Sequence, residues 1–159
     1  MLLNSEGDKK MSKALIVFGS TTGNTESTAE VINDVLEEKD WDTVLKNVDE
    51  TSVEELTWDY DLVLLGSSTW GDDEIEIQED FAEFYEKMDQ VSLSGKKVAV
   101  FGCGDSSYEY FCGAVDVIGE KVEELGGKLA VDSLKIDGDP DDADDDIKDW
   151  AEMVAEQVR

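Results

Sequence analysis

The sequence predicts an α/β fold in which helices cover both faces of a parallel sheet. Short, continuously apolar runs alternate along the chain with stretches in which apolar residues recur at helical spacing. The runs lack the alternation of a half-exposed strand, which is typical of strands buried on both sides. We therefore expect a doubly wound, three-layer α/β sandwich, formed as one domain by the 159 residues.

Three apolar runs are expected to form the centre of the sheet, and two more polar runs its edges. The central strands are Ala14–Phe18, Leu62–Gly66 and Val98–Gly102. Thr43–Asn47 and Leu129–Ile136 contain more polar residues, as suits strands at a sheet edge. The sequence therefore predicts a five-stranded sheet.

Four substantial helices are predicted, each with one apolar face. The third is expected to stop at Gly126 and Gly127. Ser52 and Glu55 have the spacing of a capping box, which would open a short turn before Trp58. The apolar positions of the helices are Ala29, Ile32 and Leu36; Ile77, Phe81, Phe84, Tyr85 and Met88; Ala114, Val117, Ile118, Val122 and Leu125; and Ile147, Trp150, Ala151, Val154 and Val158.

The composition excludes several classes of function. The formal net charge of −28 repels nucleic acid and anionic lipid. The chain has no His, so Ser/His and Cys/His nucleophile pairs are impossible, and its two Cys cannot form a familiar zinc set. No apolar run is long enough to span a membrane, and Met1–Lys10 lacks the hydrophobic segment of a secretory signal. We expect a soluble, cytoplasmic protein without a metal, whose macromolecular partners are basic proteins.

A loop rich in hydroxyl groups, Ser20–Thr25, follows the first strand and runs into a helix. Its hydroxyl and backbone N–H groups could hold a single phosphate at the helix N-terminus. A nucleoside triphosphate site is not expected, because Asn24 and Thr25 stand where the Walker pattern requires Lys and Ser or Thr. The alternative is a capped turn that binds nothing.

The loops after the third and fourth strands carry aromatic side chains. Trp70, beside Gly71, offers a flat stacking surface, or else only covers the end of the sheet. The loop Gly102–Cys112 contains three aromatic residues and could close the other side of a planar ligand. We expect Cys103 and Cys112 to be small buried residues rather than nucleophiles. The three loops share one edge of the predicted sheet, where ligands of such folds bind.

The three loops resemble those of the flavodoxins, which are small FMN-binding electron carriers. The similarity is closest to the short-chain flavodoxins of sulfate-reducing bacteria, and it extends from Ser12 to Val158. It implies a flavodoxin-like sheet of order 2-1-3-4-5 and non-covalently bound FMN. The last strand, Leu129–Ile136, lacks the long insertion of long-chain members. The motifs that carry the resemblance are STTGNT at Ser20–Thr25, STWGD at Ser68–Asp72 and GCGDSSYEYFCG at Gly102–Gly113.

The resemblance also implies which residues contact FMN. Trp70 and Tyr108 would enclose the isoalloxazine ring. The phosphate would be held by Ser20, Thr21, Thr22, Asn24 and Thr25, with help from Ser68. Backbone groups near Gly71, Asp72, Asp105, Tyr110 and Cys112 would bond the polar edge of the ring, and Gly23, Thr69, Cys103 and Gly104 complete the expected cofactor-binding set. No catalytic residue is expected.

The function implied by the resemblance is that of a low-potential one-electron carrier, cycling mainly between the semiquinone and hydroquinone forms of FMN. It would shuttle electrons, as a monomer, between redox proteins. The expected partners are basic redox proteins such as cytochromes, and oxidoreductases that use ferredoxin or flavodoxin. Residues 1–10 would be a disordered N-terminal extension, and residues 11–159 the single FMN-binding domain.

Two other functions are compatible with this fold class. A flavin-dependent quinone reductase would need a site for a second substrate, and the sequence shows no extra domain or basic patch for NADPH. A signalling receiver domain would need acidic residues where Gly19, Ser20, Ser67 and Ser68 stand. Six acids in Asp72–Asp80 could steer a basic partner to the flavin edge, whereas eight acids in Asp137–Asp149 are interpreted as a solvated helix entrance.

Overall fold

The computed structural model describes residues 12–20, 23–70, 76–104 and 112–158. Their main strands form one parallel sheet of order β2-β1-β3-β6, and β7 and β8 both pair with β6. The strands are β1 (Lys13–Gly19), β2 (Asp42–Asn47), β3 (Leu62–Ser67), β4 (Thr69–Trp70), β5 (Glu76–Ile77), β6 (Lys97–Gly104), β7 (Lys128–Leu129) and β8 (Leu134–Asp137). The helices are α2 (Asn24–Glu38), α3 (Glu79–Lys87), α4 (Gly113–Glu124) and α5 (Asp144–Val158), with short 3₁₀ turns η1 (Val48–Glu50), η2 (Val53–Thr57), η3 (Met88–Gln90) and η4 (Pro140–Ala143).

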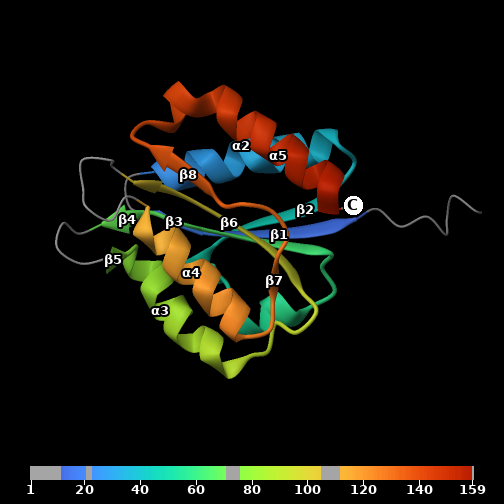
Figure 1. The fold of residues 1–159 in the computed structure, drawn as a ribbon, viewed down its shortest axis with the longest axis vertical. Coiled ribbons are helices and arrows are strands. Elements are labelled where there is room, and N and C mark those ends of the chain that lie inside the picture. Colours follow the sequence, from blue (N-terminus) through green and yellow to red (C-terminus); the bar gives the residue numbers. More distant parts are fainter. Residues whose placement is uncertain (1–11, 21–22, 71–75, 105–111, 159) are drawn as a thin grey trace, which may run out of the picture.

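The sheet is the middle layer of a three-layer sandwich (Figure 1). Helices α2 and α5 cover one face, and α3 and α4 cover the other. Side chains of β1 alternate between the two cores: Ile16 and Phe18 pack toward α2 and α5, whereas Leu15 and Val17 pack toward the opposite helices. All of these side chains are buried, which explains why the central strands read as continuously apolar.

The predicted architecture is confirmed, with one strand corrected. The order 2-1-3-4-5 holds when β7 and β8 together are counted as the fifth strand. The predicted strand Leu129–Ile136 is interrupted because its chain advances from Leu129 to Leu134 while the paired β6 advances only from Val98 to Phe101. Residues 130–133 lie outside both strands, and the Asp132 carbonyl among them accepts a 2.8 Å hydrogen bond from Trp150 Nε1.

A second correction concerns Ile77, which helical spacing placed on the same face as Phe81. Helix α3 begins only at Glu79, and Ile77 lies in β5, where it pairs antiparallel with Thr69 of β4. The β4-β5 hairpin was not predicted from the sequence. Its strands are only two residues each, which is too short to produce a recognisable pattern.

The remaining helices match the predictions. Helix α4 ends at Glu124, and Leu125 alone separates it from the expected stop at Gly126 and Gly127. Glu55 Oε2 accepts the Ser52 N–H at 2.8 Å, as the capping box predicts, and opens η2 before Trp58. Helix α5 ends beside the start of β1, where Val158 and Ser12 line one surface hollow. Within the described ranges, no helix has the length and apolar character needed to cross a membrane.

Candidate functional site

The carboxyl ends of β1, β3 and β6 lie side by side at one edge of the sheet. Gly19 at the end of β1 is in register with Ser67 at the end of β3, and β3 pairs in turn with β6. The polar segments that follow these strands therefore start next to one another. This is the edge at which ligands of doubly wound sheets bind.

Two hydroxyl groups join the first and second of these segments. Thr25 Oγ1 and Ser68 Oγ lie 2.7 Å apart, and both side chains are buried. Thr25 is in the first turn of α2, while Ser68 directly follows β3. The pair fixes the start of α2 against the end of β3, and it places two hydroxyl groups where an anion at the helix N-terminus could be bound.

The start of α2 follows a glycine in its N-cap position. Gly23 precedes the helix in the left-handed region, with φ of 94°, and its N–H donates to Ser20 Oγ at 3.0 Å. Within the described part of this loop, no side chain caps the helix. The N–H groups of a first turn have no partner inside the helix and carry a partial positive charge. They are consequently suited to a phosphate group.

The third segment joins the same helix through a cysteine. Cys103 Sγ lies 3.4 Å from Thr28 Oγ1, and Thr28 also donates to the Asn24 carbonyl at 2.9 Å. Burial raises the pKa of the Cys103 thiol, although hydrogen bonds from Thr28 and Thr25 act in the opposite direction. Cys103 is therefore a neutral thiol at physiological pH, in keeping with the packing role expected from the sequence.

Cys112 lies beside Gly104 on the other side of the same segment. A methyl group added to Gly104 would lie 3.0 Å from both the Cys112 nitrogen and its sulfur. The Cys112 sulfur contacts the Gly102 and Ile136 carbonyls at 3.8 and 3.7 Å. Burial, reinforced by the nearby Cys103, raises the pKa of the Cys112 thiol to about 12. This thiol is also unsuited to nucleophilic chemistry.

Of the predicted cofactor contacts, the structure brings together Thr25, Ser68 and Cys103 around the start of α2. Ser20, Gly23 and Asn24 lie at the same helix start, and Gly104 and Cys112 adjoin Cys103. Thr69 and Trp70 are placed as backbone in β4. Seven predicted residues lie outside the described ranges: Thr21, Thr22, Gly71, Asp72, Asp105, Tyr108 and Tyr110.

Three residues that connect the elements around this candidate site were not predicted from the sequence. Thr28 links α2 to β6, while Ser67 and Gln78 link the two ends of the β4-β5 hairpin. Thr28 was detectable in principle, because it follows Thr25 at helical spacing on a buried face. Gln78 carries no such signal, since its role depends on contacts with residues distant in the sequence.

The donor set fits the FMN implied by the sequence motifs. Hydroxyl groups and the N–H groups of a helix start suit its terminal phosphate, and the described part of the site presents no cationic side chain to it. Ser20, Thr25 and Ser68 would hold the phosphate. The adjoining segment from Ser68 to Trp70 leads to the position where the flavin ring would lie.

Comparison with known proteins gives the same family throughout. The family model described as flavodoxin matches residues 16–150. The chain is 54% identical over 148 residues to a flavodoxin of Maridesulfovibrio salexigens, covering 93% of this chain and all of the relative. It is 48% identical over 144 residues to a flavodoxin of Nitratidesulfovibrio vulgaris, covering 91% of this chain and 97% of that one. The crystal structure of oxidised flavodoxin 2 from Bacillus cereus superposes with a TM-score of 0.80 at 38% identity, covering 92% and 97% of the two chains. The chain therefore belongs to the flavodoxin family, in its short-chain form, and is an FMN-dependent electron-transfer protein rather than an enzyme.

Proposed function

We propose that this chain carries single electrons at low potential between redox proteins, on FMN held at the carboxyl edge of the sheet. The observation that carries the proposal is the buried Thr25–Ser68 hydroxyl pair at the start of α2. It supports a phosphate site without a cation, which suits a flavin mononucleotide. The single FMN-binding domain would comprise residues 11–159, whereas residues 1–10 fall outside the described ranges.

The phosphate would be bound by the first segment. Ser20, Thr21, Thr22, Asn24 and Thr25 would supply hydroxyl, amide and backbone N–H donors, and Ser68 would supply one more. Thr21 and Thr22 lie outside the described ranges. Because the N–H groups of α2 point toward this segment, they would bind a dianionic phosphate without an arginine or lysine.

Binding of FMN and riboflavin tests this placement. FMN should bind much more tightly than riboflavin, because only FMN offers a phosphate to the hydroxyl groups. Ser68→Ala should weaken FMN binding by about tenfold, corresponding to one lost hydrogen bond to a charged group of about 1.5 kcal/mol, and should leave riboflavin binding nearly unchanged. Flavin fluorescence quenching measures both affinities. Ser92→Ala is a control, because it removes only a hydroxyl oxygen that accepts the Ser94 N–H in a turn. Equal affinities for the two flavins in the unmodified protein would contradict the phosphate site.

The flavin ring would lie between aromatic residues of the second and third segments. Trp70 and Tyr108 would stack on its two faces, and backbone groups near Gly71, Asp72, Asp105, Tyr110 and Cys112 would bond its polar edge. Thr69, Gly104, Cys103 and Gly23 would complete the contacts. Stacking of this kind contributes about 1 to 3 kcal/mol per ring, judged by nucleobases.

The acidity of the chain favours a low potential. Reduction adds negative charge to the flavin, and each carboxylate about 10 Å away opposes it by roughly 0.4 kcal/mol at the dielectric constant of water. About 1.4 kcal/mol corresponds to roughly 59 mV for one electron. Several carboxylates would therefore lower the potential of the second reduction step, from semiquinone to hydroquinone, by on the order of 100 mV before screening by salt. Gly71, which could turn its carbonyl toward the flavin, would favour the neutral semiquinone.

A reductive titration tests the one-electron proposal. A blue neutral semiquinone should accumulate before the hydroquinone forms, because the protein would stabilise the neutral semiquinone and destabilise the anionic hydroquinone. The visible spectrum follows both steps. Direct conversion to hydroquinone would argue instead for two-electron chemistry, such as that of a flavin-dependent quinone reductase, which the family match does not favour.

The partners of this carrier would be basic proteins. The acidic segment Asp72–Asp80 lies in sequence beside the proposed flavin edge, and two of its acids, Glu79 and Asp80, are exposed at the start of α3. A basic cytochrome, or an oxidoreductase that uses ferredoxin or flavodoxin, would be attracted to this edge. We further propose that the carrier acts as a monomer in the cytoplasm.

A further inference from the structure

Gln78 is a buried polar residue at the junction of the β4-β5 hairpin and helix α3. Its side chain is 2% exposed, and Oε1 accepts the Phe81 N–H at 3.0 Å, so Gln78 is the N-cap of α3. Nε2 donates to Asp80 Oδ2 at 3.4 Å. Ser, Thr, Asp and Asn are the usual N-cap residues, because their short side chains reach the helix N–H groups directly. The longer side chain of Gln78 also reaches a residue outside α3.

That contact is the carboxyl end of β1. A Cβ atom placed on Gly19 would overlap Gln78 Oε1, and it would lie 3.0 Å from Phe81 Cβ. The amide group of Gln78 therefore occupies the space that a side chain at position 19 would take. Gly19 is the residue that leads into Ser20 and the proposed phosphate segment.

The backbone of Gln78 closes the base of the hairpin. Its N–H donates to the Ser68 carbonyl at 3.1 Å and to Ser67 Oγ at 3.3 Å, and Ser67 Oγ in turn donates to the Ser68 carbonyl at 2.9 Å. Ser68 is the residue whose hydroxyl contacts Thr25 at the start of α2. Gln78 thus touches the end of β1 with its side chain and the end of β3 with its backbone.

We propose that Gln78 is a positioning residue that holds the base of the β4-β5 hairpin against the end of β1, and so sets the distance between the flavin and phosphate halves of the FMN site. This inference rests on the proposed placement of FMN between these two segments. FMN must engage both halves at once, whereas riboflavin needs only the flavin half. A shift between the halves therefore lowers the preference for FMN over riboflavin, which loss of helix stability alone does not do.

Two substitutions separate the cap from the positioning contact. Gln78→Ser keeps an oxygen that caps α3 but does not reach Gly19, whereas Gln78→Met keeps the reach and loses the cap. In the full chain, Gln78→Ser should retain the melting temperature of the apoprotein within about 2 °C. It should weaken FMN binding at least tenfold and riboflavin binding less than threefold. Gln78→Met should show the reverse: a lower melting temperature with a nearly unchanged FMN-to-riboflavin affinity ratio.

Gly19→Ala provides an independent test at the other side of the contact. The added methyl group displaces the Gln78 amide, so the FMN-to-riboflavin affinity ratio should fall as in Gln78→Ser. The double variant Gly19→Ala with Gln78→Ser should lose less FMN affinity than the two single losses combined, because the amide that the methyl group displaces is already gone and only the 3.0 Å approach to Phe81 Cβ remains. If Gln78→Ser fails to fold, the single variant Gly19→Ala decides the question.

The outcomes distinguish this inference from the proposed function. If the unmodified protein prefers FMN and Gln78→Ser keeps the same preference, Gln78 is only a helix cap and the inference is wrong. Additive losses in the double variant would also contradict it. If the unmodified protein itself binds both flavins equally, the phosphate site is wrong, whatever Gln78 does.

Discussion

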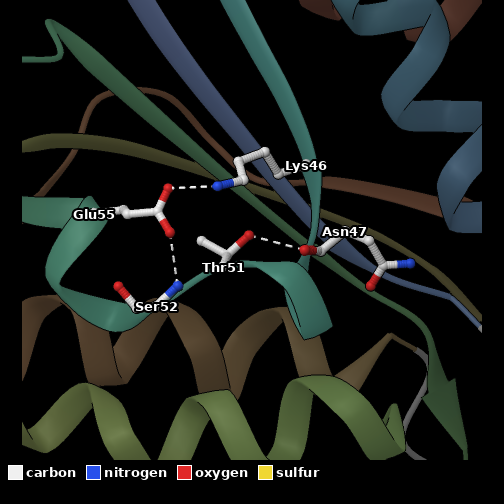
Figure 2. A network of polar contacts seen from close by, with 5 residues as sticks. All are labelled: Lys46, Asn47, Thr51, Ser52 and Glu55. Atoms are coloured by element: carbon white, nitrogen blue, oxygen red, sulfur yellow. Dashed lines mark hydrogen bonds and ion pairs between the residues drawn. The ribbon is translucent and has the colours of Figure 1, made fainter.

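At the scale of single residues, Glu55 shows how a buried carboxylate is stabilised in an acidic protein. It is 7% exposed, and Oε1 lies 2.7 Å from Lys46 Nζ while Oε2 accepts the Ser52 N–H at 2.8 Å (Figure 2). Burial alone would raise the pKa of Glu55, but the hydrogen bonds from Lys46 and Ser52 and the Lys46 charge together lower it. The ionised form therefore stabilises the folded state.

Replacing Glu55 should expose this pH dependence. Because the pKa of Glu55 in the folded chain lies below its ordinary value of 4.5, the stabilisation is complete above that pH and is lost as the pH falls through the folded pKa. Glu55→Gln should lower the free energy of unfolding by about 1 to 2 kcal/mol at pH 7, and by progressively less below about pH 4.5. Urea denaturation at several pH values measures the difference, with the exposed Glu54→Gln as control. A constant difference down to pH 2.5 would contradict the assignment.

At the scale of elements, the end of helix α4 depends on the backbone of one glycine. Gly126 has φ of +92°, and its N–H donates to the Glu123 carbonyl at 3.1 Å, while the Gly127 N–H donates to the Val122 carbonyl at 2.9 Å. A left-handed residue just past the last turn ends a helix, and other residues adopt this conformation at a cost. Gly119, in contrast, lies inside α4 with ordinary helical geometry.

The two glycines should therefore respond with opposite signs to the same substitution. Gly126→Ala should destabilise the protein by about 1 to 2 kcal/mol, because alanine is strained at positive φ. Gly119→Ala should stabilise it by roughly 0.5 to 1 kcal/mol, since the new methyl group would lie 3.5 Å from Leu129 Cδ1, an ordinary contact. Urea denaturation of the apoprotein measures both values. A stabilising Gly126→Ala would show that the backbone conformation at this helix end is not required.

At the scale of the whole molecule, the net charge of −28 dominates encounters with other proteins. Acidic residues lie on the exposed sides of α3 and α5. Such a field attracts cationic partners and repels anionic ones over roughly 10 Å at 0.1 M salt. Electron transfer should depend on ionic strength accordingly.

Transfer to a basic cytochrome should slow as ionic strength rises, because salt screens the attraction. Stopped-flow measurement of the reduced protein between 10 and 500 mM NaCl, roughly 30 to 4 Å in Debye length, gives the dependence. Ferricyanide is a matched control, since its negative charge predicts a rate that increases with salt. A cytochrome rate independent of salt would contradict steering by the acidic surface.

The sequence by itself determined the layer architecture and the sheet edge at which the three polar segments begin. Continuous apolarity identified β1, β3 and β6, because a strand buried on both faces cannot tolerate polar side chains. Helical spacing with Gly126 and Gly127 placed α4 and its end. These signals are local, so they can be read from neighbouring residues. The three polar loops were predicted to share one edge because parallel neighbouring strands must end there.

Only the tertiary structure decided the contacts within that edge. Thr25 and Ser68 are 43 positions apart, and Cys103 is 75 positions from Thr28, so no local pattern could pair them. Ile77 satisfied the helical spacing of Phe81 yet pairs with Thr69, because a strand partner across the hairpin outweighed local periodicity. The role of Gln78 depends on Gly19, 59 positions away, whose missing side chain leaves room for the amide. Packing and hydrogen bonding between distant segments determine such positions, and these depend on the whole fold.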